Sequence, residues 1–286
     1  MNSTWLQEGY AVLPGFLDVL GAEYGSELRL VDFRTRAEPA RQAINIWAAE
    51  QTRDRIPNLL APGAINEATR LLLVNALYFE GSWSSPFVRA MTAASPFTTL
   101  DGATVTVQMM RKAASMDYAS GDAYQVVDFP FVGGQLKMTL VLPEEGQFAA
   151  VRDSLTSDWL VEVTNSARNR YVLELPRFQF TWGTASLRRA LEGLGMVDAF
   201  YGEAADFSGI AENGNLVITD VIQRAYVGVD EDGAEAAAVT AVTLAPSGGE
   251  VNEPPPPIPV ILDRPFFFLI RDADGHFLFV GQVTEP

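Results

Sequence analysis

An alanine-rich stretch that runs into consecutive prolines, Asp230 to Pro259, interrupts the strand-like sequence of the C-terminal third. Alanine is the best helix former, whereas the valines and threonines at residues 239–243 favour strand, so local propensity leaves helix and loop open. The flanks decide between them, because Gly233 precedes the small residues and four prolines begin at Pro254. Proline is excluded from helix interiors and central strands. The segment is therefore predicted to be an exposed loop between strands.

The rest of the chain mixes helix and strand patterns. Apolar residues at helical spacing predict surface helices at 13–24 and 39–51, and a third at 183–195 with Thr184 as N-cap and Gly195 as its end. Residues 71–79 are apolar throughout, which is typical of a strand covered on both faces. Further strands are predicted at 103–110, 172–180, 216–229, 259–262, 264–270 and 276–283. This irregular order predicts an α+β fold with large sheets, and no repeat or second linker divides the chain.

The chain is acidic, with 36 Asp and Glu residues, 20 Lys and Arg residues and a net charge of −16. Phosphates need cations, so we expect no nucleic-acid partner and no membrane partner. The longest apolar run, residues 71–79, is also shorter than a bilayer span. Because the chain has no cysteine, disulfides, thiolate metal sites and cysteine nucleophiles are excluded.

The residue pattern gives little support to catalysis. The single histidine, His276, follows the turn Asp272–Gly275 at the end of a strand and is far from any nucleophile elbow. Neither a serine triad nor a histidine metal site is expected, and the glycine-rich nucleotide fingerprints are absent. A carboxylate pair for glycoside hydrolysis stays open as a distant alternative, although Glu144 and Glu145 have the sequence context of a solvated turn. We expect no catalytic residues, no metal and no cofactor.

Several motifs occur in a fixed order along the chain. The entry to the loop, an acidic pair, Gly233 and then E-A-A-A-x-T, resembles the reactive-centre hinge of serpins, inhibitors of serine proteases. NALYFEGSW at Asn75–Trp83 is similar to the serpin N-A-x-Y-F-x-G-x-W signature, and residues 97–110 resemble the segment after it. VLPEEG, ELPRFQF, ADFSGI and RPFFFLIRDADGHFLFVGQV continue the likeness. Together these motifs cover the chain from Trp5 onward.

The resemblance implies a serpin-like α+β fold, with a large central mixed sheet, further antiparallel sheets, surface helices and an exposed reactive-centre loop at about 231–257. It implies one domain over 1–286 that lacks its N-terminal part, because MNSTWLQEGY resembles an interior strand of the central sheet. It also places Asn75, Trp83 and Gln223 where that sheet opens. Gln223 stands where many serpins have a histidine.

In the serpin mechanism a protease cuts the loop and forms a covalent acyl complex, and the loop then inserts as a strand into the central sheet. An inserting strand needs small side chains at its inward positions. Strand alternation puts Ala234, Ala236, Ala238 and Thr240 on one face and Glu235 on the other, so we expect the first set to face inward. The implied hinge residues are Glu231, Gly233, Ala234, Glu235, Ala236, Ala237, Ala238 and Thr240.

The position of the reactive bond follows only loosely from the resemblance. The usual spacing of the family, counted from Glu231, places the cleaved bond between Ser247 and Gly248. Counting back from Pro265 places it nearer Pro254, so the bond could be any one within residues 244–251. No Lys or Arg occurs between Arg224 and Arg264, so a trypsin-like target would find no basic side chain. The small residues before the bond suggest an elastase-like or subtilisin-like protease.

Two alternatives to an inhibitor remain: a non-inhibitory serpin or inactive fragment, and, more distantly, a carboxylate-dependent hydrolase. The resemblance further implies a target serine protease as the partner, a monomer with a tendency to polymerise, and an extracellular location. We expect no signal peptide within this chain, because the first basic residue is Arg29. We expect the true start to lie upstream or the chain to be a fragment.

Overall fold

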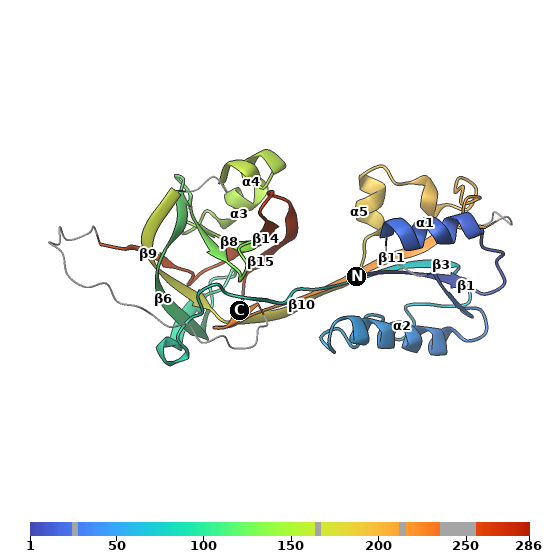
Figure 1. The fold of residues 1–286 in the computed structure, drawn as a ribbon, viewed down its shortest axis with the longest axis horizontal. Coiled ribbons are helices and arrows are strands. Elements are labelled where there is room, and N and C mark those ends of the chain that lie inside the picture. The colour runs from blue at the N-terminus through green and yellow to red at the C-terminus, as the bar shows by residue number, and fades with distance from the viewer. Residues whose placement is uncertain (25–27, 164–166, 212–215, 235–255) are drawn as a thin grey trace. The chain divides into compact units, whose positions relative to one another are not determined.

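The computed structural model describes residues 1–286 except 25–27, 164–166, 212–215 and 235–255. Two structural units make up this chain. The first consists of Met1–Tyr78 and Phe180–Val227, and the second of Phe79–Gln179 and Gly228–Pro286 (Figure 1).

The first unit is built on a five-stranded mixed sheet with the strand order β10-β11-β3-β1-β2. Strand β1 lies inside this sheet, parallel to β2 and antiparallel to β3, and β11 runs parallel to β3. The strands are β1 (Asn2–Gln7), β2 (Leu28–Val31), β3 (Leu71–Tyr78), β10 (Phe178–Ser186) and β11 (Ile218–Val229).

Apolar side chains alternate between the two faces of this sheet. On one face Trp5, Leu72 and Val74 pack with Ile44 and Trp47 of α2. On the opposite face Leu6, Leu71 and Ile218 form a second cluster with Phe200. Figure 1 shows α2 on one side of the sheet and α1 and α5 on the other. The helices are α1 (Pro14–Tyr24), α2 (Ala37–Gln51), α5 (Arg188–Gly193) and the short η2 (Asp198–Phe200). The prediction that residues 71–79 form a strand covered on both faces is confirmed.

The second unit contains an eight-stranded sheet, in which seven strands follow the order β13-β9-β6-β7-β8-β14-β15 and the eighth, β5, pairs with β6. Its pairs are antiparallel except β13–β9, which is parallel. Its strands are β5 (Ala93–Thr98), β6 (Thr104–Ser120), β7 (Tyr124–Pro130), β8 (Leu136–Pro143), β9 (Ala167–Pro176), β13 (Ile258–Ile261), β14 (Phe266–Asp272) and β15 (Phe277–Val283). A two-stranded sheet pairs β4 (Gly81–Ser82) with β12 (Gly233–Ala234).

Two helices of the second unit, α3 (Phe148–Asp153) and α4 (Ser157–Val163), cover part of its large sheet. Phe148 stacks on Phe267 of β14 with ring centroids 4.6 Å apart, and Val151 and Val163 join the same cluster. The remaining element is the short helix η1 (Arg89–Met91). Both units combine helices with mixed or antiparallel sheets, so the predicted α+β class is confirmed.

Two predicted elements differ from the structure. The single strand expected at 172–180 is two strands, because β9 ends at Pro176 and β10 begins at Phe178. Proline has no N–H to continue the ladder, and the N–H of Arg177 donates to the carbonyl of Gln108 at 2.8 Å. The strand expected at 103–110 instead extends to Ser120, since it pairs with β9 over residues 109–118.

The predicted N-cap at Thr184 is wrong. Residue 184 lies within β10, and the N–H of Leu187 donates to the carbonyl of Val221 in β11 at 2.8 Å, so sheet pairing continues past the expected helix start. The predicted helix end is confirmed: Gly195 has φ 98°, and the N–H of Met196 reaches the carbonyl of Leu191 at 2.9 Å. This is the left-handed glycine cap that favours Gly after a helix.

No helix in the described ranges is long and apolar enough to cross a membrane.

Candidate reactive-loop hinge

The chain leaves β11 through a tight turn that starts at Asp230. Its Oδ1 accepts hydrogen bonds from the N–H groups of Asp232, at 2.9 Å, and Gly233, at 3.3 Å. Gly233 and Ala234 then pair antiparallel with Ser82 and Gly81. The first residues of the predicted loop are therefore held as a turn and a short strand.

Gly233 lies where no larger residue fits. A Cβ atom added at this position would be 2.1 Å from the carbonyl oxygen of Gly81 and 2.8 Å from Cα of Ser82. Real Cβ contacts are never this short, so the close approach of the two backbones requires glycine. Ala234 follows with no exposed surface.

Trp83 holds this turn from the side of β4. Its indole Nε1 donates to the carbonyl of Asp230 and its backbone N–H to the carbonyl of Asp232, both at 2.9 Å. The ring is fully buried, stacked on Phe131 with centroids 4.7 Å apart and meeting Phe129 edge to face at 4.6 Å. The N–H of Phe87 adds a bond of 2.8 Å to the carbonyl of Glu231. Carbonyls of three consecutive hinge residues are thus fixed by the segment 83–87.

Glu231 has a side chain with no exposed surface. Arg177, in the gap between β9 and β10, donates from Nε to both carboxylate oxygens at 3.0 Å and from Nη2 to Oε1 at 2.5 Å. The hydroxyl of Thr92 donates to Oε1 at 2.5 Å. Burial alone would raise the pKa of Glu231, but the hydrogen bonds from Arg177 and Thr92 outweigh it, and the pKa lies below its ordinary value. Glu231 is therefore an ionised anchor for the loop.

Asp232 carries a second ion pair, on the outside of the turn. Its carboxylate accepts a hydrogen bond from Nη2 of Arg89 in η1. Nη1 of Arg89 also lies 3.9 Å from Oε2 of Glu231, while the Arg89 side chain is 61% exposed. Because water screens an exposed cation, we assign the main anchoring role to Arg177 and a minor one to Arg89.

Two of the three residues predicted for the sheet-opening region lie together. Gln223 of β11 and Asn75 of β3 are register partners, and Nε2 of Gln223 donates to Oδ1 of Asn75 at 3.0 Å. Nδ2 of Asn75 in turn donates to Oδ1 of Asn2 in β1 at 2.6 Å. An amide chain therefore links three neighbouring strands. The third predicted residue, Trp83, contacts the hinge, as described above.

Residues 235–255 lie outside the described residues. This range includes the predicted hinge positions Glu235, Ala236, Ala237, Ala238 and Thr240 and the predicted reactive bond between Ser247 and Gly248. The chain is described again at Pro256, two residues before β13. The described part of the hinge is Glu231, Gly233 and Ala234.

Four residues that hold the hinge were not predicted from the sequence: Arg177, Thr92, Arg89 and Asp232. Arg177 and Thr92 are 54 and 139 positions from Glu231, so no local pattern joins them. One signal was present: Arg177 occupies the alternate position that Leu173 and Leu175 fill with apolar side chains, and such a cation usually has a partner.

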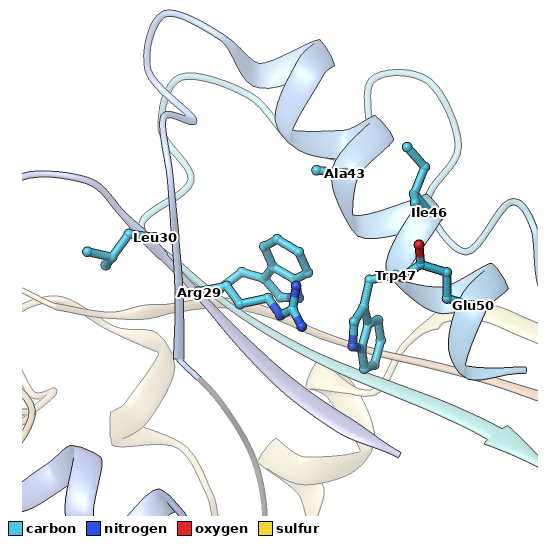
Figure 2. A pocket seen from close by; sticks show the side chains of 7 residues that line it. Arg29, Leu30, Ala43, Ile46, Trp47 and Glu50 are labelled. Carbon is cyan, nitrogen blue, oxygen red and sulfur yellow. The ribbon is translucent and has the colours of Figure 1, made fainter.

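The first unit, which does not contain the hinge, has a pocket of about 560 Å³ between α2 and strands β1 and β2 (Figure 2). Its lining includes the indoles of Trp5 and Trp47 and the guanidinium of Arg29.

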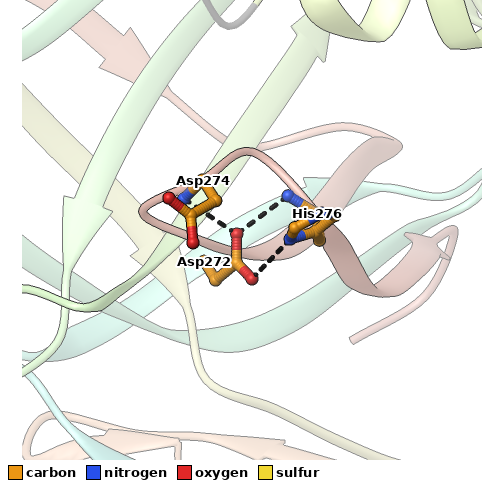
Figure 3. Close-up of side chains that lie close together, drawn as sticks. All are labelled: Asp272, Asp274 and His276. Atoms are coloured by element: carbon orange, nitrogen blue, oxygen red, sulfur yellow. Dashed lines mark hydrogen bonds and ion pairs between the residues drawn. The ribbon is translucent and has the colours of Figure 1, made fainter.

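A small polar cluster occupies the turn between β14 and β15 (Figure 3). Ligand atoms of Asp272, Asp274 and His276 lie within 4.8 Å of one another. Oδ1 of Asp272 accepts from the N–H groups of Asp274 at 3.0 Å and His276 at 2.8 Å, and Oδ2 lies 2.9 Å from Nδ1 of His276. The contact with Asp272 raises the pKa of His276. These hydrogen bonds stabilise the turn, which explains why the three side chains lie close together. His276 is the strand-end residue that the sequence predicts.

The carboxylates of Glu144 and Glu145 lie in an exposed turn after β8, as expected. Oε2 of Glu144 is 3.7 Å from Nη2 of Arg264. A solvated turn with a surface ion pair gives the hydrolase alternative no support.

Known proteins share both the sequence and the fold of this chain. The family profile described as serpin (serine protease inhibitor) matches residues 1–286. The leukocyte elastase inhibitor of Sus scrofa is 36% identical over 100% of this chain and 76% of its own length. A serpin-like protein of Thermococcus kodakarensis is 35% identical over 100% of this chain and 66% of its own length. Antithrombin-III of Mus musculus is 35% identical over 95% of this chain and 58% of its own length. The chain spans about two thirds or less of the length of these last two relatives.

Solved structures agree with the sequence comparison. Serpin48 from the insect Tenebrio molitor superposes with a TM-score of 0.88 at 30% identity, covering 100% of this chain and 75% of that structure. The thermophilic serpin tengpin in its native state superposes with a TM-score of 0.87 at 27% identity, and the match covers 100% of this chain and 72% of that structure. Fold and sequence together define the class of protein that the family profile describes. The chain belongs to the serpin family.

Proposed function

We propose that this chain inhibits a serine protease as a suicide substrate. The observation that carries the proposal is the construction of the hinge: a tightly bonded anchor at Asp230–Gly233 is followed by the small residues Ala234, Ala236, Ala237, Ala238 and Thr240. The anchor fixes one end of the loop, and small side chains suit a strand that has to enter between existing neighbours.

The chemical step belongs to the protease. Its serine oxygen attacks the carbonyl carbon of the residue before the cut, proposed as Ser247, and the bond to Gly248 breaks with a proton passing to the new amine. An ester then joins loop and protease. Water would complete the cleavage, unless insertion of the cut loop distorts the protease first.

The driving force is the new strand. About ten backbone hydrogen bonds at about 1 kcal/mol each match the stability of a whole domain, so insertion is strongly downhill. Strands β3 and β11 are the parallel neighbours that would have to separate. The hydrogen bond from Gln223 to Asn75 is a side-chain contact that such separation would break, whereas the bond from Asn75 to Asn2 joins β3 to β1 and would be kept.

We further propose an elastase-like or subtilisin-like target. Ala245, Pro246 and Ser247 are small, and the absence of Lys and Arg from 225–263 disfavours trypsin-like enzymes. The name of the relative from Sus scrofa, leukocyte elastase inhibitor, supports the same class. A monomeric inhibitor acting outside the cell completes the proposal.

The test is to mix the protein with pancreatic elastase or subtilisin and to examine the products on a denaturing gel. A detergent-stable band at the summed mass supports inhibition. In Ala236→Glu a charge would have to enter the sheet interior, so we expect cleavage without the stable band. An unchanged yield of complex from that variant contradicts insertion. Clean cleavage of the parent protein would favour a non-inhibitory serpin or an inactive fragment.

A further inference from the structure

The segment 83–87, which holds the hinge, has neither helix nor strand between its two ends. Trp83 at its start and Phe87 at its end donate to the hinge carbonyls, as described above. The residues between them, Ser85 and Pro86, belong to no ladder of backbone hydrogen bonds, so their polar groups need other partners. The position of the hinge therefore depends on what holds the middle of this segment.

Lys112 of β6 holds that middle. Its Nζ donates to the carbonyl of Ser85, to Oγ of Ser85 at 2.5 Å and to the carbonyl of Pro86 at 2.8 Å, which uses all three donors of an ammonium group. No backbone N–H in the described ranges donates to either carbonyl. The rings of Phe87 and Phe129 lie 5.9 and 5.6 Å from Nζ, within the range of cation–π attraction.

We propose that Lys112 positions the proposed reactive loop, because it fixes the middle of the segment whose two ends hold the hinge. All the groups concerned lie in the second unit. Only the effect of Lys112 on inhibition rests on the proposed function. A hinge that gives way would lengthen the loop before insertion could pull on the ester, so water would release more of the protease.

Hydrogen exchange in the absence of a protease tests the positioning directly. In Lys112→Met the indole N–H of Trp83 and the N–H of Phe87 should exchange about tenfold faster, because bonds from a charged donor are lost. The amides of β14, in the same unit, should change much less. Arg111→Met is the matched control, since Arg111 precedes Lys112 on β6, is 57% exposed and pairs with Glu174. Equal acceleration at the hinge and in β14, or none at the hinge, would overturn the proposal.

The pH profile adds a readout that a purely structural contact would not give. Burial lowers the pKa of Lys112 to about 8 from 10.5, and water would restore the ordinary value when the segment opens. Opening therefore becomes less favourable as the pH rises, and the protection of Trp83 and Phe87 should increase about tenfold between pH 7 and pH 9. A flat profile in the parent protein, or the same rise in Lys112→Met, would contradict this role of Lys112.

Lys112 is the group that accounts for such a profile. The segment 83–87 contains no titratable side chain, and burial raises the pKa of Tyr171 on β9, so that this side chain stays neutral. The charged side chains on the elements around Lys112 have partners of their own: Arg89 with Asp232, Arg111 with Glu174, and Asp128 with Arg271 and Lys137.

A reaction with pancreatic elastase or subtilisin tests the link to inhibition. Lys112→Met should raise the ratio of cleaved protein to covalent complex about threefold, because a slack hinge delays the pull on the ester. Arg111→Met should leave the ratio as in the parent. An unchanged ratio in Lys112→Met would refute the effect on inhibition. If the parent forms no complex, the proposed function fails, whereas the exchange experiment still decides whether Lys112 positions the hinge.

Should Lys112→Met not fold, Ser85→Ala serves instead, because it removes one of the three acceptors and leaves the lysine in place. Exchange at Trp83 and Phe87 should then be about threefold faster, in keeping with one lost hydrogen bond. Unaltered exchange in Ser85→Ala would count against the proposal.

Discussion

The guanidinium of Arg177 chelates the buried carboxylate of Glu231, with Nε at 3.0 Å from both oxygens and Nη2 at 2.5 Å from Oε1. Arg177 occupies the single-residue gap between β9 and β10, and Glu231 lies two residues beyond β11. The pair therefore ties the first turn of the proposed reactive loop to the junction of two other strands.

Arg177→Met should destabilise the folded protein by about 3 kcal/mol, because it leaves an ionised carboxylate buried without its cation. The free energy of urea unfolding measures the change. Adding Glu231→Gln to this variant should recover part of the loss, since a neutral amide costs less to bury. As a control, Arg152→Met removes only the exposed pair with Asp153 and should change stability by less than about 0.5 kcal/mol. Equal effects of Arg177→Met and Arg152→Met would show that the chelate does not anchor the hinge.

Gly233→Ala should detach β12 from β4. The added methyl would sit 2.1 Å from the carbonyl oxygen of Gly81, so the pairing has to open or shift. We expect a loss of about 2 kcal/mol and faster hydrogen exchange at the N–H of Trp83, which bonds to Asp232. The control is Gly21→Ala in α1, where nothing lies within 4 Å and helix propensity predicts a gain of up to about 1 kcal/mol. Unaltered exchange at Trp83 in the Gly233 variant would refute the close approach.

Lys112, which hydrogen-bonds to the segment 83–87, is expected to make the stability of the fold depend on pH. Its Nζ donates to Oγ of Ser85 at 2.5 Å and to the carbonyl of Pro86 at 2.8 Å, and burial lowers its pKa to about 8 from 10.5. Between these values the folded state binds fewer protons than the unfolded state, so the free energy of unfolding should rise with pH.

The measurement is direct, because the chain has only two lysines, Lys112 and Lys137. Lysine labelled with ¹³C gives two Cε signals, assigned with Lys137→Met, and the Lys112 signal should titrate near pH 8. Lys112→Met should abolish the rise in stability above that pH. A midpoint for Lys112 above pH 10 would contradict the effect of burial.

The loop after α2 contains two non-glycine residues with positive φ, Arg53 at 49° and Asp54 at 64°. Glycine adopts this region without steric cost, so Asp54→Gly should stabilise the fold by about 0.5 kcal/mol. Asp54→Ala, which tolerates positive φ less well than Asp, should destabilise it by a similar amount. Thermal unfolding of the two variants is the test, and shifts of the same sign would argue against backbone strain.

Local sequence patterns predicted those elements whose burial is periodic. Residues 71–79 form β3, and the helices around Phe16 and Ile44 form α1 and α2 near their expected bounds. The N-cap at Thr184 was wrong because pairing with β11 extends β10 beyond the local capping signal. The strand at 172–180 was divided because Pro176 ends the ladder and Arg177 turns to Glu231. In both cases a long-range contact outweighed local propensity.

The site was predicted in part for the same reason. Glu231, Gly233 and Ala234 follow from the hinge motif, and Asn75 and Gln223, assigned by resemblance to the same region, hydrogen-bond to each other. Other contacts join segments that are far apart in sequence. They are the hydrogen bonds of Glu231 with Arg177 and Thr92, and the buried Asp128–Arg271 pair at 2.7 Å. Such partners depend on the sheet register, which the composition of single strands does not specify.

The central claim, that loop cleavage traps the protease as an ester, is tested most directly by mass spectrometry of the products formed with pancreatic elastase. The account predicts a covalent complex of the protease with the N-terminal part of the chain, and a released peptide that begins at Gly248 or at another bond within 244–251. Two cleaved fragments with free protease and no covalent adduct, at every ratio of protein to protease, would contradict it.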